Sequence, residues 1–247
     1  MPRGTCKLCL LDKELQRSHL MAKSLYKKTR SDDPKQPHPL VRTSEGVRPS
    51  SYQVRDYVFC WDCEQRFSRE GEDYMMRLVA HRDKFPLLEM LETTGSGLSR
   101  PPVTAYRVSG TPLVDRAKIG YFAASVFWRA SVHTWKQDDG KPVSIDLGVE
   151  NNEELRQYLL GRRSFPTNAG LLTTLCTDTE SQNMFLMPGA NVKNDRVWLV
   201  VMRGFTFFFS IGAQIPTYIS RYCTMNSAGR WIMVRDCSQR HKIWELK

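Results

Sequence analysis

The sequence predicts an α+β protein, and three features of the 247-residue chain indicate this class. The N-terminal third carries two Cys-x-x-Cys pairs, a pattern typical of a zinc-stabilised module. The middle contains stretches in which apolar residues recur at helical spacing. The last third is rich in β-branched and aromatic runs bounded by turn residues. We therefore expect a zinc module at 1–80, a helical region at 81–162 and a small antiparallel sheet at 163–247.

The expected zinc module contains a strand followed by a helix. Residues 52–59 alternate between polar and apolar side chains, which predicts a strand that leads into the second cysteine pair. Residues 64–79 place Phe67, Tyr74 and Leu78 at helical spacing, which predicts a helix directly after that pair.

The rest of the chain divides into helical and strand-like segments. Residues 87–91, 113–135 and 152–160 predict helices, and the second is apolar nearly all round, as expected of a buried helix. Arg203-Gly204 predicts a hairpin turn between the two strongest strand candidates. The segments that predict strands are residues 184–187, 196–203, 205–211 and 231–236.

The chain carries a formal net charge of +10, and part of this excess lies near the N-terminus. The first sixty residues contain twelve Lys or Arg and six Asp or Glu. A basic zinc module suits a polyphosphate partner, because each phosphate that it neutralises releases counterions. Solvated lysines that serve only solubility would give the same charge, and composition does not choose between the two.

The sequence predicts no membrane association. Its most apolar runs are residues 119–128, which are too short to cross a bilayer, and residues 197–211, which an arginine and a glycine interrupt. Outside the two pairs, the cysteines are scattered: Cys176, Cys223 and Cys237. We expect these three to be buried, reduced thiols in a cytoplasmic protein.

The two cysteine pairs are Cys6 with Cys9 and Cys60 with Cys63. Each tight Cys-x-x-Cys turn directs two thiolates toward one ion, so that four sulfurs complete a tetrahedral zinc shell. Such a shell leaves no open coordination position, so the expected zinc is structural. It closes about fifty intervening residues into a loop and supplies folding energy to a small module.

His19 is the main candidate for catalysis, and it lies ten residues after Cys9. A neutral imidazole near pH 7 can accept a proton from an attacking water molecule. The same side chain could instead pack or hydrogen-bond within the zinc module, and its spacing does not distinguish these two roles.

The sequence around these residues resembles the zinc-containing HNH endonuclease family. The similarity consists of the first Cys-x-x-Cys pair, then Ser18-His19-Leu20, then the segment Phe-Cys-Trp-Asp-Cys-Glu that opens the predicted helix. It covers roughly residues 1–80, about a third of the chain. For this third, the resemblance implies a ββα-metal, treble-clef-like unit.

By this resemblance, His19 corresponds to the histidine that acts as general base on water. Glu72 or Glu70, on the predicted helix, would hold a catalytic Mg²⁺ or Mn²⁺. Glu64 lies beside the second cysteine pair, where the family often has Asn or His. Hard carboxylate oxygens suit such an ion, which stabilises the leaving 3′ oxygen as it gains charge.

Three positions depart from the family's pattern. Ser18 stands where the family has Asp, Glu or His as a metal ligand. The chain has no asparagine before Asn151, so Gln53, Asp56 or Asp62 would have to orient the base. An acidic residue replaces the family's final histidine. These differences leave open that the fold keeps its zinc without the reaction.

The sequence therefore predicts an HNH-like, metal-dependent endonuclease that hydrolyses phosphodiester bonds in a bacterial or phage defence system, with DNA favoured over RNA. The alternative is a non-catalytic, zinc-stabilised nucleic-acid-binding or adaptor protein. A third interpretation gives the C-terminal region, with its aromatic strands, a role in binding a protein partner. The residues expected to contact nucleic acid are Arg17, Lys23, Lys27, Lys28, Arg30 and Arg66.

Overall fold

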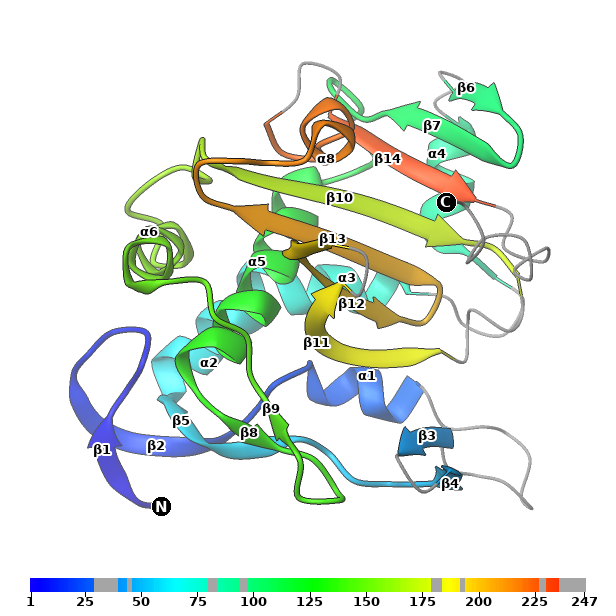
Figure 1. Ribbon diagram of the computed structural model, residues 1–247. Coiled ribbons are helices and arrows are strands. Elements are labelled where there is room, and N and C mark those ends of the chain that lie inside the picture. The colour runs from blue at the N-terminus through cyan, green and yellow to red at the C-terminus, as the bar shows by residue number, and fades with distance from the viewer. Residues whose placement is uncertain are drawn as a thin grey trace.

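The computed structural model describes residues 1–28, 40–43, 46–79, 84–93, 97–178, 184–191, 194–226 and 230–235. It confirms the α+β class: a small N-terminal sheet, a long central helix and a seven-stranded sheet (Figure 1). The central helix, α5 (Arg116–Val132), lies between the two sheets and contacts both.

The N-terminal part is built on a three-stranded antiparallel sheet in the order β1-β2-β5. The strand predicted at 52–59 is β5, which begins three residues later than expected and ends at the second cysteine pair. A separate hairpin, β3-β4, follows α1 in the chain. The elements are β1 (Arg3–Thr5), β2 (Asp12–His19), α1 (Lys23–Lys28), β3 (Leu40–Thr43), β4 (Gly46–Pro49) and β5 (Arg55–Cys60).

The helix predicted after the second cysteine pair forms, with one wider turn inside it. α2 (Trp61–Phe67) and α3 (Asp73–Leu78) are joined by a π turn at Ser68–Glu72. Gly71 in this turn packs against the backbone of α5, where a Cβ would lie 2.9 Å from the backbone nitrogen of Phe122. Glycine is required at this position because only its missing side chain allows the two helices to approach so closely.

α5 forms the predicted buried helix and joins the two halves of the molecule. Every residue from 119 to 130 is buried, which explains why the sequence is apolar nearly all round. On one side, Trp128 stacks on Phe59 of β5 with ring centroids 5.8 Å apart. On the other, Phe127 stacks on Phe209 of the large sheet at 5.1 Å.

The last third does not form the small antiparallel sheet that the sequence predicts. A seven-stranded mixed sheet runs in the order β11-β12-β13-β10-β14-β7-β6, in which β10 and β14 are parallel neighbours. The four predicted strands form, and three more join them. The strands are β6 (Gly97–Arg100), β7 (Val103–Arg107), β10 (Ala169–Cys176), β11 (Phe185–Asn191), β12 (Asn194–Met202), β13 (Phe205–Ile211) and β14 (Trp231–Arg235).

The three unpredicted strands lack the usual sequence signal. β10 is buried on both faces in the middle of the sheet, so its residues do not alternate between polar and apolar. β6 and β7 flank Pro101-Pro102, and paired prolines predict a break in regular structure. Both strands belong to the region predicted to be helical, where α4 (Pro86–Thr93), α5 and α6 (Val149–Leu159) do form.

The remaining described elements are short. β8 (Trp135–Lys136) pairs with β9 (Pro142–Val143), and α8 (Thr217–Arg221) packs Ile219 on Leu172 and Val197 of the large sheet. The predicted hairpin joins β12 to β13. Its two turn residues have positive φ, 46° at Arg203 and 87° at Gly204, as a type I′ turn requires.

One expectation about the scattered cysteines is wrong. Cys176, at the end of β10, is disulfide-bonded, whereas we expected a reduced thiol. Cys223 is a buried thiol, as expected, and Cys237 lies outside the described residues. In the part of the chain that the structure describes, no helix combines the length and apolar character needed to span a bilayer.

Candidate metal centre and adjoining His19 site

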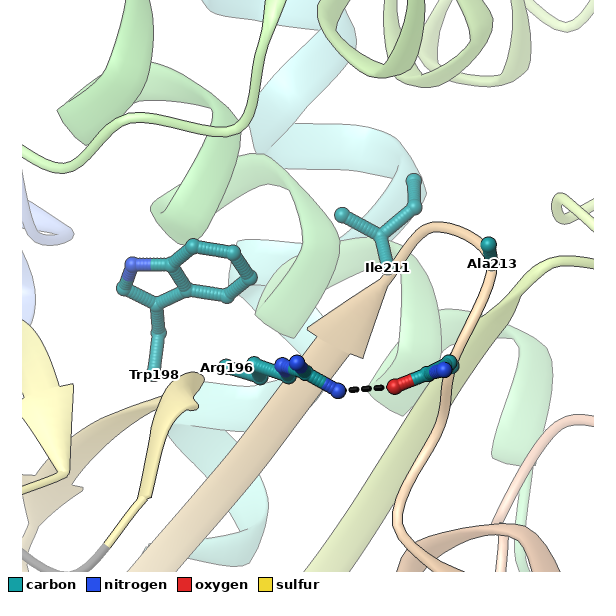
Figure 2. Close-up of a pocket in the computed structure, with 5 residues that line it drawn as sticks. Arg196, Trp198, Ile211 and Ala213 are labelled. Carbon is teal, nitrogen blue, oxygen red and sulfur yellow. Dashed lines mark hydrogen bonds between the residues drawn. The ribbon is translucent and has the colours of Figure 1, made fainter.

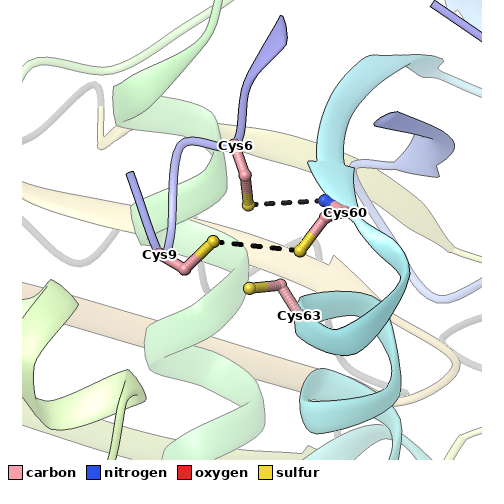
Figure 3. A group of neighbouring side chains, drawn as sticks. All are labelled: Cys6, Cys9, Cys60 and Cys63. Carbon is pink, nitrogen blue, oxygen red and sulfur yellow. Dashed lines mark hydrogen bonds between the residues drawn. The ribbon is translucent and has the colours of Figure 1, made fainter. Parts of the chain in front are cut away.

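The four cysteines of the two pairs converge on one point (Figure 3). Cys6 and Cys9 come from the turn between β1 and β2, Cys60 ends β5, and Cys63 lies in the first turn of α2. Their sulfur atoms all lie within 4.8 Å of one another, and those of Cys9 and Cys60 are 3.8 Å apart. A tetrahedron of Zn–S bonds of about 2.3 Å has edges of about 3.8 Å. The cluster therefore fits a zinc ion.

The turn that carries the first pair is closed by its own backbone. The Leu10 N–H donates to the Cys6 carbonyl at 2.9 Å, and the Cys6 N–H donates to the Leu11 carbonyl at 3.0 Å. Leu10 takes a left-handed conformation with φ of 62°, which bends the chain so that Cys6 and Cys9 face the same point. This local geometry holds the first two sulfurs close together, and β5 and α2 supply the other two.

The surroundings of the cluster favour thiolate at Cys6, whereas burial raises the pKa of the Cys60 thiol. The Cys60 backbone N–H donates to the Cys6 sulfur at 3.3 Å. A hydrogen bond from Cys63 lowers the pKa of the Cys6 thiol to about 4, and the same contact raises the pKa of Cys63. All four sulfurs are available to one ion, so the site is closed and its expected role is structural.

His19 is the last residue of β2 and pairs in register with Arg55 of β5. Its Nε2 lies 2.9 Å from the side-chain oxygen of Gln53. Because that oxygen accepts, Nε2 carries the hydrogen and Nδ1 is left as the acceptor. Burial is the main cause of a lowered His19 pKa, to which Arg55 and Lys23 also contribute, so the imidazole is neutral at pH 7.

Of the three residues considered as substitutes for the missing asparagine, Gln53 is the one that contacts His19. Asp56 lies 2.9 Å from Nε2 of His133, and Asp62 pairs with Lys13 at 2.6 Å. The side chains of Asp56 and Asp62 thus have partners elsewhere on the surface of the module.

Glu64 and Glu72 lie close to each other and to a buried arginine, Arg129 of α5. Glu72 Oε1 lies 2.7 Å from Nη2 of Arg129, and its side chain is 16% exposed. The charge of Glu72 raises the pKa of His19, although burial outweighs this effect. Burial raises the pKa of the Glu64 carboxyl, whereas Arg129 and a hydrogen bond from Ser18 lower it. Glu64 Oε1 is buried without a hydrogen-bond partner among the described residues.

Glu70 does not share this cluster. It lines a hollow of about 370 Å³ beside α5, together with Arg66, Lys118, Tyr121 and Arg163. The predicted carboxylate trio of Glu64, Glu70 and Glu72 is therefore divided between two sides of the helical run.

Ser18, which stands where the family has a metal ligand, has a structural role inside the module. Its side chain is buried, and its Oγ accepts a hydrogen bond from the Phe59 backbone N–H of the neighbouring strand at 3.1 Å. Ser18 thus braces β2 against β5, facing the interior.

Sequence reasoning missed Arg129 and Arg55. Arg129 is 1% exposed, and its guanidinium carbon lies 4.0 Å from the centre of the Phe67 ring. One signal was present: a single arginine inside an apolar run must have a partner, because an unpaired buried charge is costly. Arg55 could have been found from the pairing of β2 with β5, which the sequence did not specify.

Of the predicted basic residues, Arg17 lies on β2, and Lys23, Lys27 and Lys28 lie on α1, which follows it in the chain. Arg17, Lys23 and Lys27 are exposed, and Lys28 is half-buried. Arg17 lies two residues before His19 on β2, so the two side chains share a face of the strand. Arg66 lines the hollow with Glu70. Arg30 lies outside the described residues.

A second hollow, of about 400 Å³, lies at the end of the large sheet (Figure 2). Arg196 and Trp198 of β12 and Ile211 of β13 line it with Ala213 and Gln214, and the Arg196 guanidinium donates to Gln214. None of the predicted site residues contributes to this hollow.

Comparison with protein-family models, with curated proteins and with solved structures finds no match to this chain. The four-cysteine cluster therefore indicates a zinc site without a family assignment. The resemblance to zinc-containing HNH endonucleases continues to depend on the motifs in residues 1–80.

Proposed function

We propose that this protein is an HNH-like, metal-dependent endonuclease that hydrolyses phosphodiester bonds, with DNA as the favoured substrate. The observation that carries the proposal is the arrangement at the end of β2. There the His19 imidazole is oriented by Gln53, and the partly exposed carboxylate of Glu72 lies near enough to shift the pKa of His19.

His19 would act as general base. Its Nε2–H is held by Gln53, so Nδ1 is the nitrogen that can accept a proton from water. The lowered pKa keeps Nδ1 unprotonated at pH 7. This is the protonation state that a base needs in order to activate a water molecule for attack on phosphorus.

Glu72 is the best candidate for holding a divalent ion. Burial raises the pKa of Glu64, whereas Glu72 is partly exposed, so Glu72 is the carboxylate more accessible to a divalent ion. When bound, Mg²⁺ or Mn²⁺ would supply charge stabilisation to the leaving 3′ oxygen. Glu64, whose carboxylate is enclosed, would act on Arg129 and Glu72 electrostatically without binding the ion. Glu70 would not belong to the centre.

Nucleic acid would approach along the exposed face next to His19. Arg17, Lys23 and Arg55 lie around the imidazole, and the charges of Lys23 and Arg55 both lower its pKa. Guanidinium and ammonium groups are the usual partners of phosphate oxygens. We assign Arg17 and Arg55 to the scissile phosphate, and Lys23 and Lys27 to the adjoining backbone.

A second candidate, a zinc-stabilised nucleic-acid-binding protein without catalysis, is favoured by two observations. Ser18 occupies the sequence position at which the family has an ion ligand, but its side chain faces the interior. Glu72 already has a cationic partner in Arg129. A bound divalent ion would therefore have fewer carboxylate oxygens than in the family's pattern.

Plasmid cleavage separates the two candidates. Zinc-loaded wild type is incubated with supercoiled DNA and Mg²⁺ or Mn²⁺, beside His19→Ala and His133→Ala. His133 is a suitable control because it also lies at the edge of the module and contacts a carboxylate, that of Asp56. The nuclease proposal expects His19→Ala to lose about 100-fold or more of the rate, while His133→Ala keeps it.

Binding without cleavage would support the second candidate. In that case wild type and His19→Ala would retain the same salt-dependent affinity for DNA, and neither metal ion would produce nicked plasmid.

A further inference from the structure

Arg129 contacts the His19 site, although neither the cysteine pairs nor the HNH-like motif in the sequence predicts these contacts. It belongs to α5, outside residues 1–80, and its side chain is 1% exposed. A guanidinium keeps its charge at any accessible pH, so burying it is costly unless anionic and polar groups surround it. Its partners therefore indicate what the residue does.

The two partners with defined geometry both belong to the His19 site. Nη1 donates to the backbone carbonyl of His19 at 3.3 Å, and Nη2 lies 2.7 Å from Oε1 of Glu72. The rings of Phe67 and Phe59 lie 4.0 Å and 6.0 Å from the guanidinium carbon and restrict its position. The planar fork of one arginine thus joins the end of β2 to the π turn that carries Glu72.

This arrangement sets the orientation of the Glu72 carboxylate. The contact with Arg129 involves Oε1, so Oε2 is the oxygen that a ligand can use. Carboxylates that bind metal ions are commonly held by a second partner that fixes their direction, and the ion pair with Arg129 would do this for Glu72. Glu64 supplies the second negative charge near the guanidinium, because Arg129 acts on its carboxyl electrostatically.

We propose that Arg129 is a positioning residue that holds Glu72 beside His19, so that the centre is complete only when the zinc module is docked on α5. This proposal builds on the proposed nuclease function. A purely structural ion pair would also attach the module to α5, but it would leave Glu72 in place after the arginine is removed.

The test uses full-length, zinc-loaded protein and keeps the net charge of the Glu64–Glu72–Arg129 cluster as it is in wild type. Arg129→Met alone would strand two carboxylates, so the informative variant is Glu64→Gln with Arg129→Met, which removes one charge of each sign. Glu64→Gln alone is its control. Zinc content and circular dichroism establish that both variants are folded.

Two measurements follow. The first is the affinity for Mn²⁺, by titration with electron paramagnetic resonance. We expect the double variant to bind at least about tenfold more weakly than Glu64→Gln, because Glu72 has lost its partner. Equal affinities in the two proteins would overturn the proposal.

The second measurement is the His19 pKa by NMR, with and without Glu72→Gln, in both backgrounds. If Arg129 holds Glu72 in place, Glu72→Gln lowers the His19 pKa in the Glu64→Gln background and changes it much less in the double variant. If Glu72 stays in place without Arg129, its field is no longer opposed, and the effect grows, which would contradict the proposal.

The two proposals fail separately. Wild type that neither cleaves plasmid nor binds Mn²⁺ would refute the nuclease. The His19 titration would still decide whether Arg129 positions Glu72, because it needs neither metal nor substrate.

Discussion

The N-terminal module and the seven-stranded sheet are stabilised by different means. The main sheet of the module has three strands, of three to eight residues each, and distant segments of the module meet at four cysteines. The large sheet buries Phe205, Phe207 and Phe209 fully against the molecule's centre. We therefore expect the module to depend on a metal and on its contact with α5 in addition to apolar burial, whereas the sheet depends on apolar burial.

The two regions also differ in their chemistry. His19, Gln53 and Glu72 lie on the module, and the charged residue that joins them to the rest of the chain comes from α5. The buried residues of both regions form one continuous core cluster through α5. We infer that the sheet and α5 form a scaffold, and that docking on α5 completes the His19 site of the module.

The largest expected effect comes from breaking the metal centre. Cys63→Ser should abolish zinc binding and lower the free energy of unfolding by roughly 5 kcal/mol or more, because zinc binding is coupled to folding. Zinc analysis and urea denaturation measure this. Cys223→Ser is the matched control, a buried cysteine beside the large sheet and outside the four-cysteine cluster, and should cost about 1 kcal/mol without loss of zinc. Similar losses of zinc and of unfolding free energy in both variants would contradict the proposed difference between the module and the sheet.

A cavity in the sheet should destabilise without affecting zinc. Phe207 is fully buried and packs on Phe205 and on Phe122 of α5. Phe207→Ala should cost roughly 3–5 kcal/mol, by lost transfer free energy and the cavity left behind. Urea denaturation gives the loss, and zinc stoichiometry of the folded protein should stay unchanged. Zinc loss in the folded variant would show that the sheet helps to form the metal centre directly.

The contact between the regions is tested at Gly71. Its Cβ position lies 2.9 Å from the Phe122 backbone nitrogen, so Gly71→Ala should force α2–α3 away from α5 at a cost of about 1–3 kcal/mol. Gly189→Ala, whose nearest neighbour lies 3.9 Å away, is the control and should cost less than about 1 kcal/mol. Thermal denaturation compares them, and equal melting temperatures would argue against tight docking.

The smallest expected effect concerns pH. The unprotonated form of His19 is the active base. The cleavage rate should therefore be highest at neutral pH and should fall as the pH drops through the lowered His19 pKa, which lies below about 6.5. Arg55→Gln removes a nearby positive charge that lowers this pKa, so the acidic limb should move to higher pH. A pH–rate profile that does not respond to Arg55→Gln would exclude His19 as the titrating group.

The sequence was most informative where local chemistry determines the structure. The spacing of Cys6, Cys9, Cys60 and Cys63 was sufficient to predict their cluster, because each pair acts through a tight turn. Arg203-Gly204 predicted its hairpin because positive φ at both positions is a local requirement.

Features that depend on distant parts of the chain could not be predicted in this way. β10 is central and buried on both faces, so its pattern did not distinguish it from other apolar segments. The π turn at Ser68–Glu72, which forms where Gly71 meets α5, has no local signal in the sequence. The pairing of Arg129 with Glu72 joins positions more than fifty residues apart, and no local signal specifies it.

The most direct test of the central claim compares two glutamates two residues apart in the same π turn. Initial rates of plasmid cleavage with Mn²⁺ are measured for zinc-loaded Glu72→Gln and Glu70→Gln. If Glu72 shares a centre with His19, Glu72→Gln loses about 100-fold or more of the rate, whereas Glu70→Gln stays within about twofold of wild type. Equal rates for the two variants would contradict the account.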